Sequence, residues 1–411
     1  MTYLIDTVKK KGSTIHRAKW VIADSATIFQ DGYLEIENGL IKDIGKWGKN
    51  RCGHVIDHGH GVITPSLINS HTHLDLTGLK GKIPFENGFS SWVKKLIHMR
   101  EIMGEKALAK SSLDGIDELI KSGCCVVGDI STFDSTWDII SKSDIYGVNF
   151  KEFIGNFLPE KISCNIKGRN IVASISGHAP HTTSPELITA LKNISNRYSL
   201  PFSIHLAESL DEIDFFSTGK GAWADLLKER GIDFSMWNIS GKTPVDHLKK
   251  RGILDKKTIA VHLLYATEKD IKTLADTGTR ISLCPRSNFN LHKRLPPLEK
   301  ILKAGIKPSL GTDSLASVES LSLFDEMAYT ASSFPGVPPE VIFDMGTING
   351  AAALGLDKRS GSLYPEKYGI FLYLPLKVVK KSNIMEALVN MEFDDYIHKM
   401  RNPSRLGIGK R

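Results

Sequence analysis

Short apolar runs alternate along this chain with longer segments that repeat hydrophobic residues at helical spacing. Eight such runs end near His73, Asp129, Phe153, His178, His205, His262, Cys284 and Asp313. Runs that stay apolar without strict alternation are typical of parallel strands buried on both faces. Eight of these strands, separated by helices, predict an α/β fold of the TIM-type (β/α)8 barrel class.

Helix boundaries support this alternation of strands and helices. Ser184 followed by Pro185 has the form of an N-cap and first helical residue, and Thr267 opens a segment that Gly278 closes. Serine and threonine side chains accept hydrogen bonds from free backbone N–H groups at a helix start, and glycine tolerates the left-handed conformation at a helix end. We therefore expect helices after the fourth and sixth strands.

The two ends of the chain have a different pattern. Residues 14–44 contain short alternating runs, and Asn38-Gly39 lies between two of them. Both residues tolerate the positive φ of a tight hairpin turn. A further β-like run, residues 369–374, is expected to complete the same small sheet. The predicted organisation is an N-terminal part of a composite β domain (1–60), a metal-dependent hydrolase barrel (61–358), and a C-terminal part of the β domain with a basic tail (359–411).

Composition excludes several classes of protein. The 411 residues are 41% hydrophobic and 24% charged, enough to bury a large core. The net charge of +7 is dispersed among 46 acidic residues, so nucleic acid is not an expected partner. No apolar stretch has the length of a signal peptide core or membrane span, which predicts a cytoplasmic protein without membrane contact. Five cysteines without repeated spacing indicate reduced thiols.

Residues of the kind that bind metals stand where several of the apolar runs end. His71 and His73 follow the first run, His205 the fifth and Asp313 the eighth. Residues two apart on a strand point to the same side, and barrel enzymes place their chemistry at the carboxyl ends of strands. Hydrolytic metals take nitrogen and oxygen ligands from several elements and keep one position open. The sequence predicts one divalent ion per chain and a metal-dependent hydrolase.

Two further residues are candidates for proton transfer. Glu208 lies three residues after His205, where it is either a proton shuttle beside the metal or an exposed carboxylate at a helix start. His262 ends the sixth run, where it is either a group that orients or deprotonates water beside Asp313 or a satisfied core histidine. Their place at barrel strand ends favours the catalytic interpretation of both.

Candidate substrate contacts are less distinctive. His178 ends the fourth run and is either a fifth ligand or a substrate contact; we expect the latter, because four protein ligands and a water complete a mononuclear site. A second metal is not expected, since no lysine stands where a carbamate could bridge two ions. Arg286 or Asn288, after the seventh run, could touch substrate or belong to an ordinary turn.

At these residues the chain resembles the amidohydrolase superfamily, and within it the mononuclear aminohydrolases that deaminate purine and pyrimidine rings. The resemblance runs from about Gly61 to Leu356 and rests on residues 69–74, 205–208, 261–262, 283–288 and 310–317, which occur in the family's order. It implies zinc, or alternatively iron, on His71, His73, His205 and Asp313, with Glu208 and His262 handling protons. Trp92 and Glu101 match a pair that grips the ribose side, and His178 matches a family histidine.

Two segments depart from the family's pattern, the first of which indicates a different substituent on the substrate and the second of which concerns the closing β segment. Related nucleoside deaminases carry arginines after the third strand, where this chain has Lys151 and Glu152, and residues 366–369 replace the usual opening of the closing β segment. The loops after the seventh and eighth strands look most like aminodeoxyfutalosine deaminases of menaquinone biosynthesis.

The resemblance thus implies hydrolytic deamination of a purine-type ring with release of ammonia, 6-amino-6-deoxyfutalosine being the first candidate substrate. In the expected mechanism, Asp313 and His262 help form hydroxide and Glu208 protonates the ring nitrogen and then the leaving amine. Alternatives are deamination of guanine, 8-oxoguanine, methylthioadenosine or adenosylhomocysteine, and chlorohydrolysis of a triazine. A catalytically silent barrel that acts as a binding subunit is a remote alternative. A homo-oligomer is the default expectation for a soluble enzyme.

Overall fold

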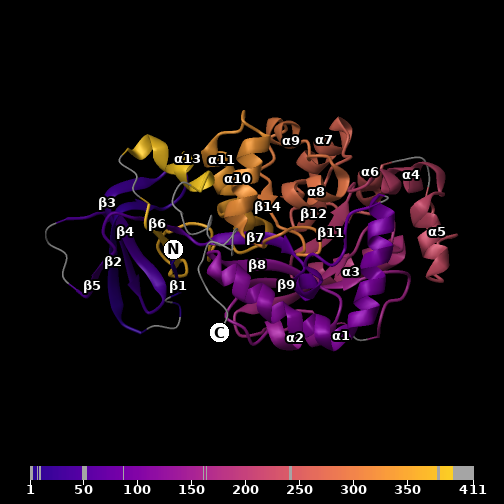
Figure 1. Ribbon diagram of the computed structural model, residues 1–411, viewed down its shortest axis with the longest axis horizontal. Helices are drawn as coiled ribbons and strands as arrows, with labels where there is room; N and C mark the ends of the chain where they lie inside the picture. Colours follow the sequence, from indigo (N-terminus) through magenta and orange to yellow (C-terminus); the bar gives the residue numbers. More distant parts are fainter. Residues whose placement is uncertain are drawn as a thin grey trace, which may run out of the picture.

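Eight parallel strands form the larger of two sheets in the computed structural model (Figure 1). They are β7 (Leu67–Thr72), β8 (Cys124–Ser131), β9 (Tyr146–Phe153), β10 (Ile171–Gly177), β11 (Phe202–Leu206), β12 (Thr258–His262), β13 (Arg280–Leu283) and β14 (Ser309–Leu310). Each pairs with its neighbour in sequence order. A bridge between Thr72 and Asp313 connects the last strand to the first, and the backbone N–H groups of Thr312 and Asp313 donate to the carbonyl of His71. The predicted TIM-type barrel is confirmed.

The structure describes residues 3–6, 8, 11–48, 53–86, 88–160, 162, 164–239, 243–376 and 380–391. The predicted basic tail lies outside the described residues.

Helices cover the outside of the barrel. They are α1 (Phe89–Lys121), α2 (Asp134–Ile140), α3 (Pro185–Arg197), α4 (Leu210–Thr218), α5 (Ala222–Glu229), α6 (Pro244–Lys250), α7 (Glu268–Thr277), α8 (Pro285–His292), α9 (Leu298–Lys303), α10 (Leu323–Ser333), α11 (Pro339–Met345), α12 (Ile348–Ala353) and α13 (Ile384–Val389), with short 3-10 turns η1 (Leu74–Leu79) and η2 (Lys381–Asn383). The predicted caps are confirmed: the Ser184 hydroxyl accepts from the Leu187 N–H, and Thr267 forms a capping box with Asp270. Gly278 ends α7 with a left-handed φ of 68°.

The smaller sheet combines both ends of the chain, as predicted. Its strands are β1 (Tyr3–Asp6), β15 (Ile370–Leu374), β6 (Val62–Pro65), β2 (Ser13–Ile22), β3 (Ile28–Glu37) and β4 (Leu40–Lys46) in spatial order, with β5 (Val55–Asp57) paired to β2. In Figure 1 the indigo strands of this sheet, β1 to β6, lie to one side of the barrel. Asn38 and Gly39, with φ of 51° and 82°, make the predicted hairpin turn between β3 and β4.

The apolar run that precedes His71 is divided between the two sheets. β6 pairs with β2 and β15 in the small sheet, whereas β7 pairs with β8 in the barrel, and Ser66 lies between them. Residues 62–72 are buried throughout, so the hydrophobic pattern is the same on both sides of the break. The pairing partners that divide this run lie far away in sequence, so its continuous hydrophobicity gives no sign of the break.

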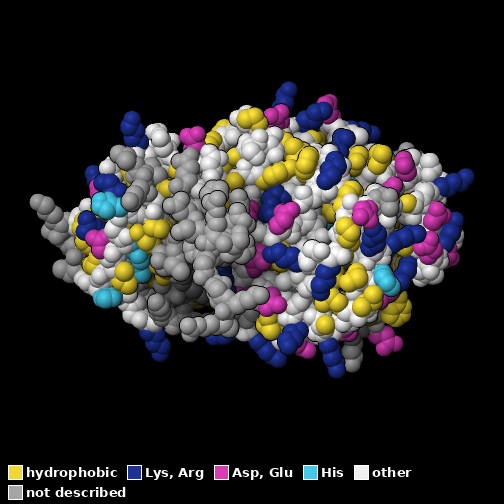
Figure 2. All heavy atoms as spheres, viewed as in Figure 1, with side chains coloured by type: hydrophobic (Ala, Val, Ile, Leu, Met, Phe, Trp, Pro, Cys, Tyr) yellow, Lys and Arg dark blue, Asp and Glu magenta, His cyan; other side chains and the backbone are white. Residues whose placement is uncertain are grey.

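The surface mixes charges of both signs. On the face shown in Figure 2, lysine and arginine side chains are interspersed with aspartate and glutamate, without a continuous basic area. Among the described residues, no helix is both long enough and apolar enough to cross a membrane.

Candidate active site

Four side chains from three barrel strands converge at the carboxyl ends of those strands. His71 lies in β7, His73 follows it by two residues, His205 lies in β11, and Asp313 follows β14. The Nε2 atoms of His71 and His205 are 3.2 Å apart. Asp313 Oδ1 lies 3.6 Å from His73 Nε2 and 4.0 Å from His71 Nε2. The barrel thus places three imidazole nitrogens and one carboxylate oxygen around a common centre.

Burial sets the protonation of these groups. It is the largest cause that holds the pKa of His71, His73 and His205 well below the ordinary histidine value, and the neighbouring imidazoles lower it further. Neutral imidazoles are the form of histidine that binds metal ions. Within the groups His71, His73, Asp313 and His71, His205, His262, the candidate ligand atoms lie within 4.8 Å of one another. These residues fit a divalent ion with nitrogen and oxygen ligands.

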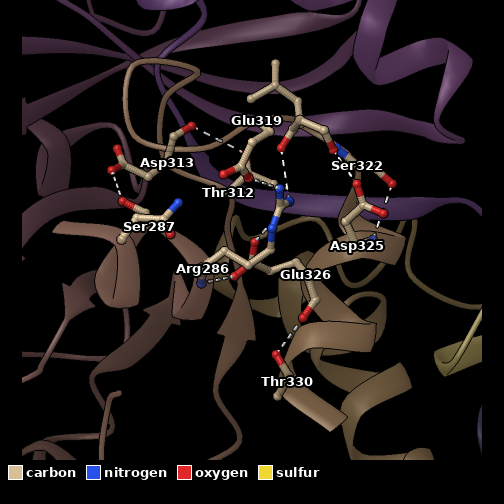
Figure 3. Close-up of polar contacts among 12 residues, drawn as sticks. Arg286, Ser287, Thr312, Asp313, Glu319, Ser322, Asp325, Glu326 and Thr330 are labelled. Atoms are coloured by element: carbon tan, nitrogen blue, oxygen red, sulfur yellow. Dashed lines mark hydrogen bonds and ion pairs between the residues drawn. The ribbon is translucent and has the colours of Figure 1, made fainter. Parts of the chain in front are cut away.

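The other oxygen of Asp313 is fixed by two hydroxyl groups. Ser287 Oγ donates to Asp313 Oδ2 at 2.5 Å, and Ser317 Oγ donates to the same oxygen at 2.9 Å. Figure 3 shows the Ser287 contact with the Asp313 carboxylate. This arrangement leaves Oδ1 directed toward the histidines. Asp313 also has a left-handed φ of 59°, a conformation that few residues other than glycine adopt and that aspartate tolerates better than most.

A hydrogen-bonded network around Arg286 holds the segment that carries Ser287. The Arg286 N–H donates to Glu326 Oε1 at 2.8 Å, and its guanidinium donates to the Ser320 carbonyl and the Glu319 carboxylate, each at 3.1 Å (Figure 3). Glu326 belongs to α10, and its pKa is raised to about 7, chiefly by burial. Arg286, one of the two residues considered as substrate contacts, therefore anchors the start of α8 to α10.

Glu208 faces two histidines beside the ligand cluster. Its Oε1 lies 3.6 Å from His262 Nε2 and 3.6 Å from His292 Nε2. Its backbone N–H donates to Glu212 Oε2 at 2.7 Å, which fixes the start of α4 relative to β11. Burial raises the pKa of Glu208, but the adjacent imidazoles of His262 and His292 outweigh it and hold the pKa well below the usual range. Glu208 is therefore ionised at neutral pH and able to accept a proton.

His262 is oriented from behind by Asn288. Asn288 Oδ1 lies 3.0 Å from His262 Nδ1, so that nitrogen carries the hydrogen and Nε2 is left facing Glu208. Asn288 is 1% exposed and lies behind His262 rather than at the cavity wall, where a substrate contact would be. His262 has a left-handed φ of 75°.

A cavity of about 640 Å³ opens onto these groups. His73, His205, Glu208, His262 and Asp313 line it, and so do the sequence-predicted substrate residues Trp92, Glu101 and His178. The Nδ1 atom of His178 lies 2.6 Å from Thr182 Oγ1, and burial is the main cause that lowers its pKa to about 3. A neutral His178 thus directs its other nitrogen toward the cavity. The volume is in the range of sites that enclose drug-sized molecules.

Several cavity residues were not predicted from sequence. Glu152, at the end of β9, is 5% exposed, forms a third candidate ligand group with His178 and His205, and has its pKa raised to about 8, chiefly by burial. Its place at the carboxyl end of the third strand was the available signal. Arg230, directly after α5, also lines the cavity, and His292, the last residue of α8, lies beside Glu208. Neither is at a strand end, so the sequence gives no comparable signal for them.

The chain matches the amidohydrolase family model over residues 62–399, a range that contains the whole ligand cluster and the cavity. The chain belongs to the amidohydrolase family. Members of this family are metal-dependent hydrolases, in agreement with the converging histidines and aspartate.

Named relatives of this amidohydrolase are deaminases, which hydrolyse carbon–nitrogen bonds. A 5'-deoxyadenosine deaminase from Methanosphaera stadtmanae is 28% identical over 390 residues, covering 89% of this chain and 84% of the relative. A 5-methylthioadenosine/S-adenosylhomocysteine deaminase from Aquifex aeolicus is 27% identical, covering 80% and 74%. The crystal structure of Helicobacter pylori aminofutalosine deaminase in complex with methylthio-coformycin superposes with a TM-score of 0.81 at 21% identity, covering 92% of this chain and 96% of that one.

Proposed function

We propose that this amidohydrolase deaminates a 6-aminopurine nucleoside that is modified on its sugar, releasing ammonia. The observation that carries the proposal is the position of Glu208 and His262 on the wall of the cavity, directly beside the ligand cluster. The names of similar proteins support a nucleoside substrate with a changed 5' end. Two relatives are named for 5'-deoxyadenosine and for 5-methylthioadenosine, and a structural neighbour is named for aminofutalosine.

His71, His73, His205 and Asp313 would hold one divalent ion, for which zinc is our proposal and iron the alternative. When bound, the ion would supply the Lewis acidity that makes water a nucleophile at neutral pH. Asp313 Oδ2 is occupied by two hydroxyl donors, so this carboxylate is fixed in place before substrate arrives.

Side chains of the protein carry out the proton transfers. Ionised Glu208 accepts one proton from the attacking water and delivers it to the ring nitrogen next to the amino-bearing carbon. The second proton, from the hydroxyl group now on that carbon, passes to the leaving amine, so that a carbonyl forms as ammonia departs. His262, with Nε2 directed toward Glu208, orients the water together with Asp313. Trp92, Glu101 and His178 contact the substrate from the cavity wall, and Asn288 positions His262.

Aminodeoxyfutalosine remains our first candidate substrate, with 5'-deoxyadenosine and 5-methylthioadenosine as alternatives. A role in menaquinone biosynthesis is proposed only with aminodeoxyfutalosine as the substrate. Cytoplasmic location and a homo-oligomeric state stay predictions.

The decisive variant is Glu208→Gln. It retains the shape of the side chain but cannot take up a proton, so we expect loss of at least about 100-fold in kcat with unchanged metal content. Ammonia release from a panel of aminodeoxyfutalosine, 5'-deoxyadenosine, methylthioadenosine and guanine, measured with elemental analysis, tests both points. Full activity of the variant would remove Glu208 from proton transfer, and no ammonia from any member of the panel would overturn the proposed reaction.

A further inference from the structure

An ion pair lies at the outer part of the cavity, away from the buried ligands. Arg230, directly after α5, donates from Nη1 to Glu101 Oε1 of α1 at 2.8 Å, and both residues line the cavity. Their side chains are 49% and 53% exposed, whereas those of His262 and Glu208 are 2% and 11% exposed. A substrate whose reacting ring lies beside Glu208 would therefore extend its other end toward Arg230.

A second ion pair between α1 and the end of α5 provides a matched comparison for Arg230. Lys94 of α1 donates to Glu229 of α5 at 2.8 Å, with similar exposure, and the described cavity wall includes neither residue. Figure 1 shows α1 and α5 beside each other. Half-exposed pairs of this kind contribute at most about 1 kcal/mol to stability. The two pairs differ in one respect, which is that only Glu101 and Arg230 face the cavity.

The surroundings of Arg230 suit an anion. Leu226, Leu227 and Ile232 line the neighbouring wall, so a charge that enters there is screened less than in open water. A guanidinium has five N–H donors in a planar fork that matches a carboxylate, and the bond to Glu101 uses one hydrogen of Nη1. The carboxylate of Glu101 lies beside the guanidinium, so a singly charged carboxylate meets less repulsion there than a doubly charged phosphate.

We infer that Arg230 forms a binding site for a carboxylate carried on the sugar side of the substrate. This inference rests on the proposed function, which places the purine ring at Glu208. It adds a requirement that the proposed reaction does not contain, since deamination itself needs no group at the far end of the cavity. Arg230 would set which nucleosides are preferred without taking part in proton transfer.

The test compares two synthetic nucleosides that differ only in charge: 5'-S-(3-carboxypropyl)-5'-thioadenosine and its primary amide, with 5'-deoxyadenosine as a neutral reference. We expect the metal-loaded wild-type enzyme to favour the acid, and Arg230→Gln to reduce the acid-to-amide ratio of kcat/KM by about tenfold or more, mainly through KM. Arg230→Lys keeps the charge but loses the fork and should fall between the two. Lys94→Gln, which breaks the matched pair, should leave the ratio unchanged.

Each alternative outcome has a distinct meaning. An unchanged acid-to-amide ratio in Arg230→Gln, or the same reduction in Lys94→Gln, would overturn the assignment of Arg230. Deamination of 5'-deoxyadenosine with neither thioether accepted would overturn it as well, because the cavity would not admit the substituent. If none of these three nucleosides nor any member of the substrate panel releases ammonia with the wild-type enzyme, the proposed function itself fails.

Discussion

Asp313 shows how single hydroxyl groups prepare a carboxylate for its task. Oδ2 accepts from Ser287 and Ser317, and Oδ1 is thereby left for the histidine cluster. Hydrogen bonds to charged groups contribute about 1.5–3 kcal/mol each. We expect Ser287→Ala to lower kcat/KM by roughly tenfold, because Ser317 still holds the carboxylate. Steady-state kinetics and metal content of the purified variant measure the effect.

Ser332→Ala is the matched control for that variant. Ser332 is an exposed residue of α10, and among the described contacts its hydroxyl donates only to the Tyr329 carbonyl. It should retain wild-type kcat/KM. A Ser287→Ala enzyme as active as this control would mean that Ser317 alone is sufficient to orient Asp313.

Functional residues could be predicted from the sequence where a metal-binding or proton-transferring side chain stands at the end of a strand. His71, His205, His262 and Asp313 were proposed because each follows an apolar run, and the barrel brings them to one cavity. Arg230 had no such marker, since its position depends on how α5 packs against α1. Asn288 was found by its place after the seventh strand, but only the three-dimensional structure shows that it contacts His262.

At the scale of elements, the junction between the last and first barrel strands leaves no room for a side chain at Gly311. A Cβ there would lie 2.7 Å from the His71 carbonyl oxygen and 2.8 Å from its Cβ. Gly311→Ala should therefore separate His71 from Asp313, destabilise the fold by about 1–3 kcal/mol, and reduce metal occupancy and activity. Thermal unfolding and elemental analysis report the two effects.

Gly336→Ala provides the comparison. Its added Cβ would come no closer than 3.6 Å, to Glu299 Oε1, and its backbone needs no positive φ. We expect unchanged metal occupancy and a midpoint of unfolding near that of the wild type. If Gly311→Ala bound metal as well as Gly336→Ala, the close approach of β14 to β7 would not be what sets the ligand geometry.

The elements that sequence predicted best are those defined by local chemistry. The Asn38-Gly39 turn and the caps at Ser184 and Thr267 depend on residues within a few positions of each other. The break between β6 and β7 depends instead on β15, about 300 residues later along the chain, and both sides of it are equally buried. Hydrophobic periodicity reports burial but not the pairing partner, so it could not divide this run.

For the whole molecule, the ligand cluster connects segments from the beginning, middle and end of the barrel. His71 lies in β7, His73 directly follows β7, His205 lies in β11 and Asp313 follows β14. An ion held by all four would therefore bind the folded chain and not the unfolded one. Such binding raises the free energy of unfolding by about 3–4 kcal/mol when free metal exceeds its Kd by 100- to 1,000-fold. Removal of metal by a chelator should lower the Tm by roughly 3–5 °C for a chain of this length, and added zinc should restore it.

Two variants separate binding at this cluster from binding elsewhere. Asp313→Ala removes a ligand from the end of the barrel and should abolish the zinc-dependent rise in Tm. His60→Ala removes an exposed histidine near the small sheet and should retain the full rise. A wild-type Tm that is the same with chelator and with zinc would contradict a metal site that joins these strands. A zinc-dependent rise that persists in Asp313→Ala would mean that Asp313 is not needed to hold the stabilising ion. It would contradict a site in which the ion connects the first and last barrel strands.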